Sequence, residues 1–123
     1  MPRTETSHWT VLVVDDDPDV RQYAASVLDE AGYRVLTAAD GESALAVVER
    51  DDSIDVLFTD VVMPGINGFE LARAATAQRP SLKVLFASGY ATDLTPAGQL
   101  LKKPYRPLQL TREIESLLPR PAA

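Results

Sequence analysis

The sequence contains no cysteine and a single histidine, His8. The absence of cysteine excludes disulfide scaffolds, thiolate metal sites and thiol nucleophiles, and it is compatible with a reducing compartment. Because the one histidine lies in a polar segment at the start of the chain, a histidine-rich zinc site and a Ser-His-Asp triad are both poorly supported.

Long hydrophobic runs are also absent. No apolar stretch approaches the roughly 18 residues that cross a bilayer, and residues 1–8 are polar, without the apolar segment of a signal peptide. The net charge of −6 would repel nucleic acid, and no stripe of lysine and arginine overrides it. We therefore expect a cytoplasmic protein that binds neither membranes nor nucleic acid.

What the sequence does contain is the composition of one soluble globular domain. It has 123 residues, of which 46% are hydrophobic and 24% charged. A domain of this length can bury a core without disulfides or a structural metal. No repeat, low-complexity tract or linker divides the chain, so we expect a domain over 9–118 between tails at 1–8 and 119–123.

Short apolar runs alternate with helical patterns five times. Strands are predicted at Trp9–Val14, Tyr33–Ala38, Ile54–Thr59, Leu82–Ala87 and Leu100–Leu101. The first helix is predicted to begin at Pro18, with Asp17 as its N-cap, and the second to follow the cap Asp40. Further helices are predicted at Phe69–Arg79, at Thr92–Gln99, where the helix is short or irregular, and from Pro107 to Leu118. This alternation predicts an α/β fold whose parallel sheet carries helices on both faces.

Polar residues stand at the ends of four predicted strands. Right-handed crossovers bring the carboxyl ends of parallel strands to one edge of the sheet, where this chain would display Asp15, Asp16, Asp60, Ser88 and Lys103. Asp60 is the most informative, because it ends a buried strand and faces a loop rich in proline and glycine, where open α/β sheets place their ligands. Together these groups predict a site for a phosphate and a cation.

The chemistry of that edge follows from its carboxylates. Close carboxylates repel each other, so they need a hard cation, or one of them must bind a proton. Oxygen ligands without histidine or cysteine favour Mg²⁺, with Mn²⁺ as an alternative, over zinc. Asp60 is the best candidate nucleophile for an aspartyl phosphate, while Lys103 and Ser88 can contact phosphoryl oxygens.

Four motifs then resemble those of two-component response-regulator receiver domains, the CheY-like superfamily: Val11–Asp17, Thr59–Gly68, Ser88 and Lys103–Pro104. The resemblance covers Thr10 to Leu118. It implies a flavodoxin-like, doubly wound five-stranded parallel sheet of strand order 2-1-3-4-5. It also implies a phosphorylation switch of a phosphorelay, in which Asp60 accepts a phosphoryl group from a histidine kinase phosphohistidine.

The resemblance assigns the remaining roles as well. Asp16 and Asp60 would ligate Mg²⁺ directly together with the Val62 backbone carbonyl, and Asp15 would act largely through water. Ser88 and Lys103 would sense the phosphoryl group. The protein would be a switch that assists its own phosphorylation and dephosphorylation rather than an enzyme with a separate substrate. Its partners would be a histidine kinase or phosphotransfer protein and a downstream protein, with the chain a monomer or weak dimer.

The sequence departs from the common receiver pattern at the switch. The position three residues before the lysine is often aromatic, and here it is Leu100. The segment Phe86–Tyr90 resembles the "FAT GUY" variant of receivers, with serine in place of threonine. Val62 and Tyr90 would flank the path of an attacking water, and neither carries a carboxylate or amide, so we predict slow autodephosphorylation.

Other classes fit less well. Haloacid-dehalogenase-like phosphatases also use an aspartyl phosphate, and Asp15 and Asp17 match their first motif, but Asp19 replaces the expected threonine or valine and the chain is short for a cap. An interaction module that no longer takes phosphate is disfavoured because every site position is filled. Since five residues follow Leu118, we expect a single-domain regulator or the terminal receiver of a hybrid kinase.

Overall fold

The computed structural model describes residues 9–89 and 99–119, with the side chain of Gln99 left out. Along the chain it contains β1 (Thr10–Val14), α1 (Pro18–Glu30), β2 (Arg34–Ala38), α2 (Gly41–Arg50), β3 (Val56–Asp60), α3 (Gly68–Gln78), β4 (Lys83–Ser88), β5 (Gln99–Lys102) and α4 (Pro107–Leu117). The strands form one sheet of order β2-β1-β3-β4-β5, and each adjacent pair is parallel. This confirms the predicted flavodoxin-like fold.

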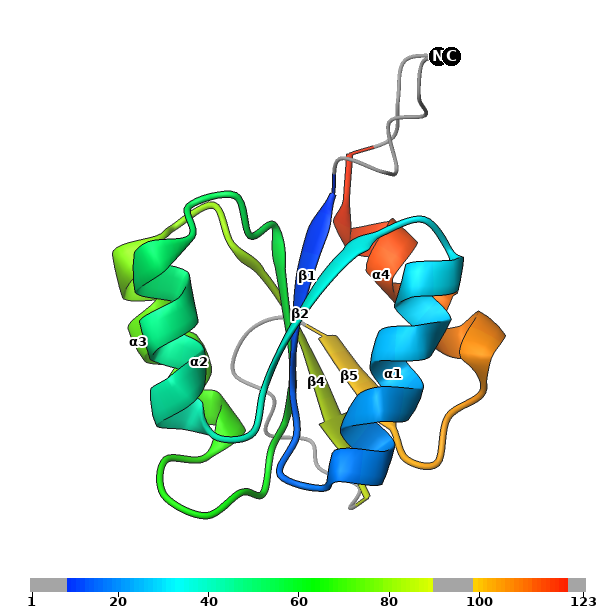
Figure 1. Cartoon of the computed structure of the whole chain (residues 1–123), viewed down its shortest axis with the longest axis horizontal. Coiled ribbons are helices and arrows are strands. Elements are labelled where there is room, and N and C mark those ends of the chain that lie inside the picture. Colours follow the sequence, from blue (N-terminus) through cyan, green and yellow to red (C-terminus); the bar gives the residue numbers. More distant parts are fainter. Residues whose placement is uncertain (1–8, 90–98, 120–123) are drawn as a thin grey trace.

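The sheet is covered by helices on both faces. In Figure 1, α2 and α3 lie on one face, and α1 and α4 lie on the other. Because successive side chains of a strand point to opposite faces, the core divides into two clusters. Leu12 and Leu57 belong to the α2 and α3 side, whereas Val11 and Phe58 belong to the α1 and α4 side. All of β1 is buried, as expected for a central strand covered on both faces.

Polar residues begin the helices that surround the site. The carboxylate of Asp17 accepts hydrogen bonds from the backbone amides of Asp19 and Val20, which confirms its predicted role as the N-cap of α1. Asn67 caps α3 in a capping box with Glu70. Such caps satisfy amides that the first helical turn leaves without partners.

The main differences from the predicted elements lie at strand ends. Gln99 was predicted to end a helix, but it belongs to β5, which pairs with β4 from Leu85↔Gln99 to Ser88↔Lys102. Backbone pairing extends this strand over polar residues that a hydrophobic pattern does not mark. The rest of the predicted fourth helix lies outside the described residues, and so does Tyr90. Both predicted tails also lie outside them, apart from Pro119. No helix within the described ranges is long and apolar enough to cross a membrane.

Candidate functional site

Three carboxylates meet at the carboxyl edge of the sheet. Asp15, Asp16 and Asp60 each place an oxygen within 4.8 Å of the others. Sheet register explains this proximity, because Val14 pairs with Thr59, so the residues that follow β1 lie beside the last residue of β3. Asp15 is buried and Asp16 is exposed, while the Asp60 side chain is 12% exposed. The predicted acidic cluster therefore forms at a partly buried edge.

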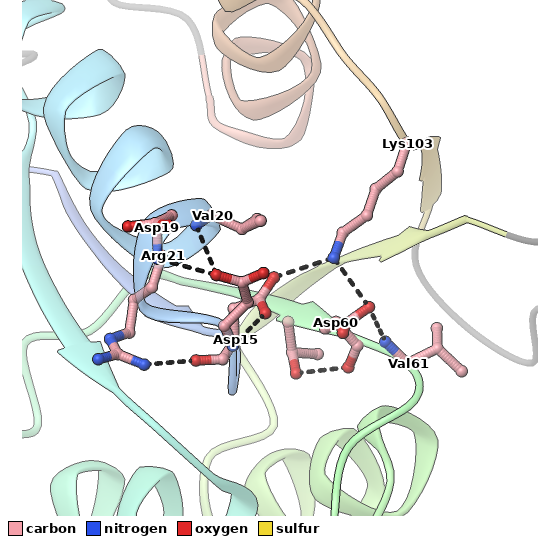
Figure 2. Close-up of polar contacts among 9 residues, drawn as sticks. Asp15, Asp19, Val20, Arg21, Asp60, Val61 and Lys103 are labelled. Atoms are coloured by element: carbon pink, nitrogen blue, oxygen red, sulfur yellow. Dashed lines mark hydrogen bonds and ion pairs between the residues drawn. The ribbon is translucent and has the colours of Figure 1, made fainter.

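Lys103 joins two of these carboxylates. Figure 2 shows its side chain reaching from the end of β5 toward Asp15 and Asp60. The Nζ atom lies 3.0 Å from Asp15 Oδ2 and 3.3 Å from Asp60 Oδ1. β4 lies between β5 and β3, so the long aliphatic stem is what lets Lys103, which directly follows the edge strand β5, reach the centre of the sheet. The ammonium group offsets the repulsion between the two acids.

Asp15 is held by donors from three directions. Its Oδ1 accepts from the Asp17 amide at 2.9 Å and its Oδ2 from Lys103. Its backbone oxygen accepts from Arg21 Nη1 at 2.8 Å (Figure 2). The sequence reasoning missed Arg21. Its position one turn into α1 is the available signal, because helical side chains point back toward the helix N-terminus.

The environment of Asp60 favours its protonated form. Burial, followed by the charge of Asp15, raises the pKa of Asp60 above its ordinary value, although Lys103 and the Val61 amide oppose the shift. Burial alone would lower the pKa of Lys103, but its hydrogen bond to Asp15 and the charges of Asp60 and Asp15 outweigh burial and raise it. Lys103 therefore remains a cation, and Asp60 is an acid whose charge depends on its neighbours.

The other predicted site residues lie nearby. Ser88 is buried at the end of β4, and its backbone oxygen accepts from the Lys103 amide at 2.8 Å. Val62 lies two residues beyond Asp60 and is 62% exposed. Leu100 is partly buried and packs against the core cluster on the α2 and α3 side. The structure thus brings most of the predicted site residues to one edge of the sheet: Asp15, Asp16, Asp60, Ser88 and Lys103.

Tyr105 is a second residue that the sequence reasoning missed. Its ring is buried, with its centroid 5.8 Å from that of Phe58 and 5.9 Å from that of Tyr23. Burial, then the charge of Asp15, raises the pKa of its hydroxyl. The ring also lines an apolar pocket of about 480 Å³ next to Lys103, together with Tyr23 and Pro104. Its position directly after Lys103–Pro104 is the only sequence signal for it.

The donor set fits a hard cation. Carboxylate oxygens cluster at the site. The chain has no cysteine, and residues 9–89 and 99–119 contain no histidine, so neither sulfur nor imidazole ligands join them. Mg²⁺ prefers one or two carboxylates plus water and phosphoryl oxygens. A cation there would reduce the repulsion among the three acids, and the nearby ammonium group would remain available for an anionic ligand.

Comparison with known proteins agrees with this geometry. Residues 11–115 match the family model of the response regulator receiver domain. The receiver protein CpdR of Brucella abortus is 36% identical over 115 residues, covering 88% of this chain and 95% of CpdR. The sensor kinase CckA of the same organism is 36% identical over 117 residues, but the match spans only 12% of that protein.

Solved receiver structures share the fold. The receiver domain of a hybrid histidine kinase CckA has a TM-score of 0.81 and 38% identity, covering 89% of this chain and 99% of that domain. Vibrio cholerae CheY4 has a TM-score of 0.84 and 33% identity, covering 89% and 98%. These relatives give no support to the haloacid dehalogenase alternative. With its sheet order, acidic cluster and bridging lysine, the chain belongs to the response regulator receiver domain family, the signalling switches of two-component systems.

Proposed function

We propose that this protein is a phosphorylation-activated switch in which Asp60 accepts a phosphoryl group from a phosphohistidine of a histidine kinase or phosphotransfer protein. One observation carries the proposal. The Asp60 carboxylate lies among Asp15, Asp16 and Lys103 at the end of a central strand. That arrangement supplies a nucleophile, oxygen ligands for a cation, and a positive charge for an anion.

The transfer itself needs little from the protein beyond placement. A carboxylate oxygen of Asp60 forms a bond to phosphorus, and the phosphorus–nitrogen bond of the phosphohistidine breaks. The departing imidazole keeps the electron pair of that bond and takes one proton from solvent, which leaves neutral histidine and an aspartyl phosphate. Catalysis of such a step rests on positioning and on neutralising charge.

The acidic residues would hold Mg²⁺, with Mn²⁺ as an alternative. Asp16, Asp60 and the Val62 carbonyl are the proposed direct ligands. Asp15 would act through water, because both of its carboxylate oxygens already accept hydrogen bonds from the protein. Bound Mg²⁺ would neutralise charge on the phosphoryl oxygens. A Thermotoga maritima relative, TrrA, with 30% identity and a TM-score of 0.82, has been solved in complex with Mg²⁺-BeF.

Lys103 and Ser88 are the proposed sensors of the phosphoryl group. In the unphosphorylated protein Lys103 pairs with Asp60 Oδ1. After transfer, one carboxylate oxygen of Asp60 would carry the phosphoryl group, and the ammonium group of Lys103 would pair with a phosphoryl oxygen instead. Ser88 would donate its hydroxyl to another. The protein would therefore assist its own phosphorylation and dephosphorylation without turning over a separate substrate.

The setting of the switch is also proposed. The match to nearly all of CpdR supports a single-domain regulator, and the match to the CckA receiver supports a terminal receiver of a hybrid kinase. We propose a cytoplasmic protein, monomeric or weakly dimeric, that signals to a protein rather than to nucleic acid. The proposed receiver unit is 9–118.

Intact mass measurement tests the proposal. Wild type and Asp60→Asn are incubated with a small phosphodonor, with Mg²⁺ or with EDTA, and Asp52→Asn serves as a control at an exposed turn. We expect one Mg²⁺-dependent phosphoryl adduct on wild type and on Asp52→Asn, and none on Asp60→Asn. No adduct on wild type, or an equal adduct on Asp60→Asn, would refute it. Hydrolysis of a generic phosphomonoester would revive the phosphatase alternative.

A further inference from the structure

Gly68, the first residue of α3, touches the backbone of Asp60. It is buried, and a Cβ atom built on it would lie 2.3 Å from the Asp60 carbonyl oxygen and 2.9 Å from Val61 Cα. Positive φ angles in the described residues occur at Gly32 and Gly65, and not at Gly68. Close approach of two backbones, rather than an unusual dihedral angle, is therefore what demands glycine at this position.

The same peptide is held by hydrogen bonds. The Gly68 amide donates to the Val61 oxygen at 2.8 Å, which closes the loop 61–67. The buried hydroxyl of Thr59 donates to the Asp60 carbonyl oxygen at 2.9 Å. On the other side, the Val61 amide lies 3.1 Å from the Ala87 oxygen and 3.0 Å from Asp60 Oδ1. Backbone and side chain of Asp60 are thus fixed by a single set of contacts.

We propose that Gly68 and Thr59 are positioning residues for phosphoryl transfer, because together they fix the Asp60–Val61 peptide, which adjoins the acceptor carboxylate and leads into the loop that carries the Val62 carbonyl. This inference rests on the proposed role of Asp60 as phosphoacceptor. It assigns a function to residues outside the proposed set of cation ligands and phosphoryl sensors.

The expected size of the effect follows from the contact distance. A side chain at position 68 would have to push the Asp60 carbonyl away by about 1 Å to restore an ordinary contact, and misplacement on that scale can slow a reaction by about 100-fold. The three carboxylates have oxygens within 4.8 Å of one another, so the same displacement would also disturb the cation ligands. Residues that orient metal ligands typically change affinity by about 10–100-fold when mutated.

Gly41 provides a matched control for a purely structural role. It is also buried and also the first residue of a helix, α2. A Cβ atom built on Gly41 would lie 2.2 Å from Ile66 Cγ1. That contact is with a side chain, which can change rotamer, and not with the backbone of Asp60. Alanine at either position would therefore destabilise the fold, but only alanine at position 68 would move the acceptor peptide.

The experiment compares Gly68→Ala, Gly41→Ala, Thr59→Val and Thr59→Ser with wild type. Three quantities are measured: the Kd for Mg²⁺ by calorimetry, the rate of phosphoryl adduct formation at saturating Mg²⁺, and the urea midpoint. We expect Gly68→Ala to raise the Kd by about tenfold or more and to slow the reaction by about 10–100-fold. Gly41→Ala should stay within about twofold of wild type in both, despite a lower urea midpoint. Thr59→Val should lose part of the rate, and Thr59→Ser, which keeps the hydroxyl, should restore it.

Two results would overturn the inference. The first is a folded Gly68→Ala protein that binds Mg²⁺ and accepts phosphate as wild type does. If Gly68→Ala does not fold, the two Thr59 variants provide the test. Equal Kd values and equal rates for Thr59→Val and Thr59→Ser would then overturn the inference. A wild-type protein that accepts no phosphoryl group would instead refute the proposed function, and the Mg²⁺ affinities would still show whether Gly68 orders the acidic cluster.

Discussion

Asp60→Asn should make the protein more stable at neutral pH when Mg²⁺ is absent. The substitution keeps the size of the side chain and removes one negative charge from a cluster of three acids. It also removes one partner of Lys103, which keeps its closer ion pair with Asp15 at 3.0 Å. The site is therefore expected to sacrifice stability for the charge that phosphoryl transfer requires.

The magnitude can be worked from the distances. At an effective dielectric constant near 20, each acid within 4.8 Å repels the Asp60 carboxylate by roughly 3 kcal/mol. The attraction of Lys103 at 3.3 Å is worth roughly 5 kcal/mol on the same scale. Asp15 alone repels the Asp60 carboxylate less than Lys103 attracts it, and solvent screens the exposed Asp16. The cost of the charge on Asp60 therefore comes first from its burial, and we expect its removal to raise the free energy of unfolding by about 1–2 kcal/mol.

The pH dependence has a definite sign. The pKa of Asp60 is raised in the folded protein, first by burial and then by Asp15. A raised carboxyl pKa means that the contribution of Asp60 to the stability of the wild type is most favourable where Asp60 is protonated and is lost as pH rises through the folded pKa. The asparagine variant lacks this loss. Its advantage should therefore be present at pH 7 and should disappear below the unfolded pKa, near 4.

Thermal unfolding in EDTA at low salt measures the difference. We expect Asp60→Asn to melt several degrees higher than wild type at pH 7, with the gap closing at acid pH and on addition of saturating Mg²⁺, which binds the wild type more tightly. Asp52→Asn makes the same change in net charge at an exposed turn and should not reproduce the gain. A variant that is no more stable than wild type at pH 7, or a gain that does not depend on pH, would refute the reasoning.

Three further predictions concern Arg79, Val62 and the pH dependence of Mg²⁺ binding. Arg79→Ala should lower the free energy of unfolding by about 1.5–3 kcal/mol, because the Arg79 guanidinium donates to the carbonyls of Val48 at 3.0 Å and Asp51 at 2.8 Å at the end of α2. Urea titration measures this loss, and an unchanged midpoint would contradict it. Val62→Asn should shorten the lifetime of phosphorylated Asp60, measured by phosphate release, since an amide at this exposed position can orient an attacking water. A wild-type lifetime of only seconds with Mg²⁺ present would count against the predicted slow autodephosphorylation. Mg²⁺ affinity should fall as pH drops through the raised pKa of Asp60, because the ligand must be deprotonated, and a Kd by calorimetry that is constant from pH 7 to pH 4 would disprove it.

Local chemistry made much of the fold predictable from sequence. The apolar runs marked the strands, and Asp17 with Pro18 marked the start of α1, because capping depends on residues a few positions apart. Strand ends were less predictable. Gln99 joined β5 because its backbone pairs with Leu85 of β4, and this pairing depends on a neighbouring strand rather than on the character of the residue itself.

The sequence by itself determined which groups would meet, since the carboxyl ends of parallel strands share one edge and each predicted site residue stands at such an end. Only the tertiary structure decided how they meet. Lys103 crosses β4 to bridge Asp15 and Asp60, and Gly68 lets α3 touch the Asp60 backbone. The physical reason is that such distances depend on the order and register of strands distant in sequence and on close packing, which no local pattern of residues encodes.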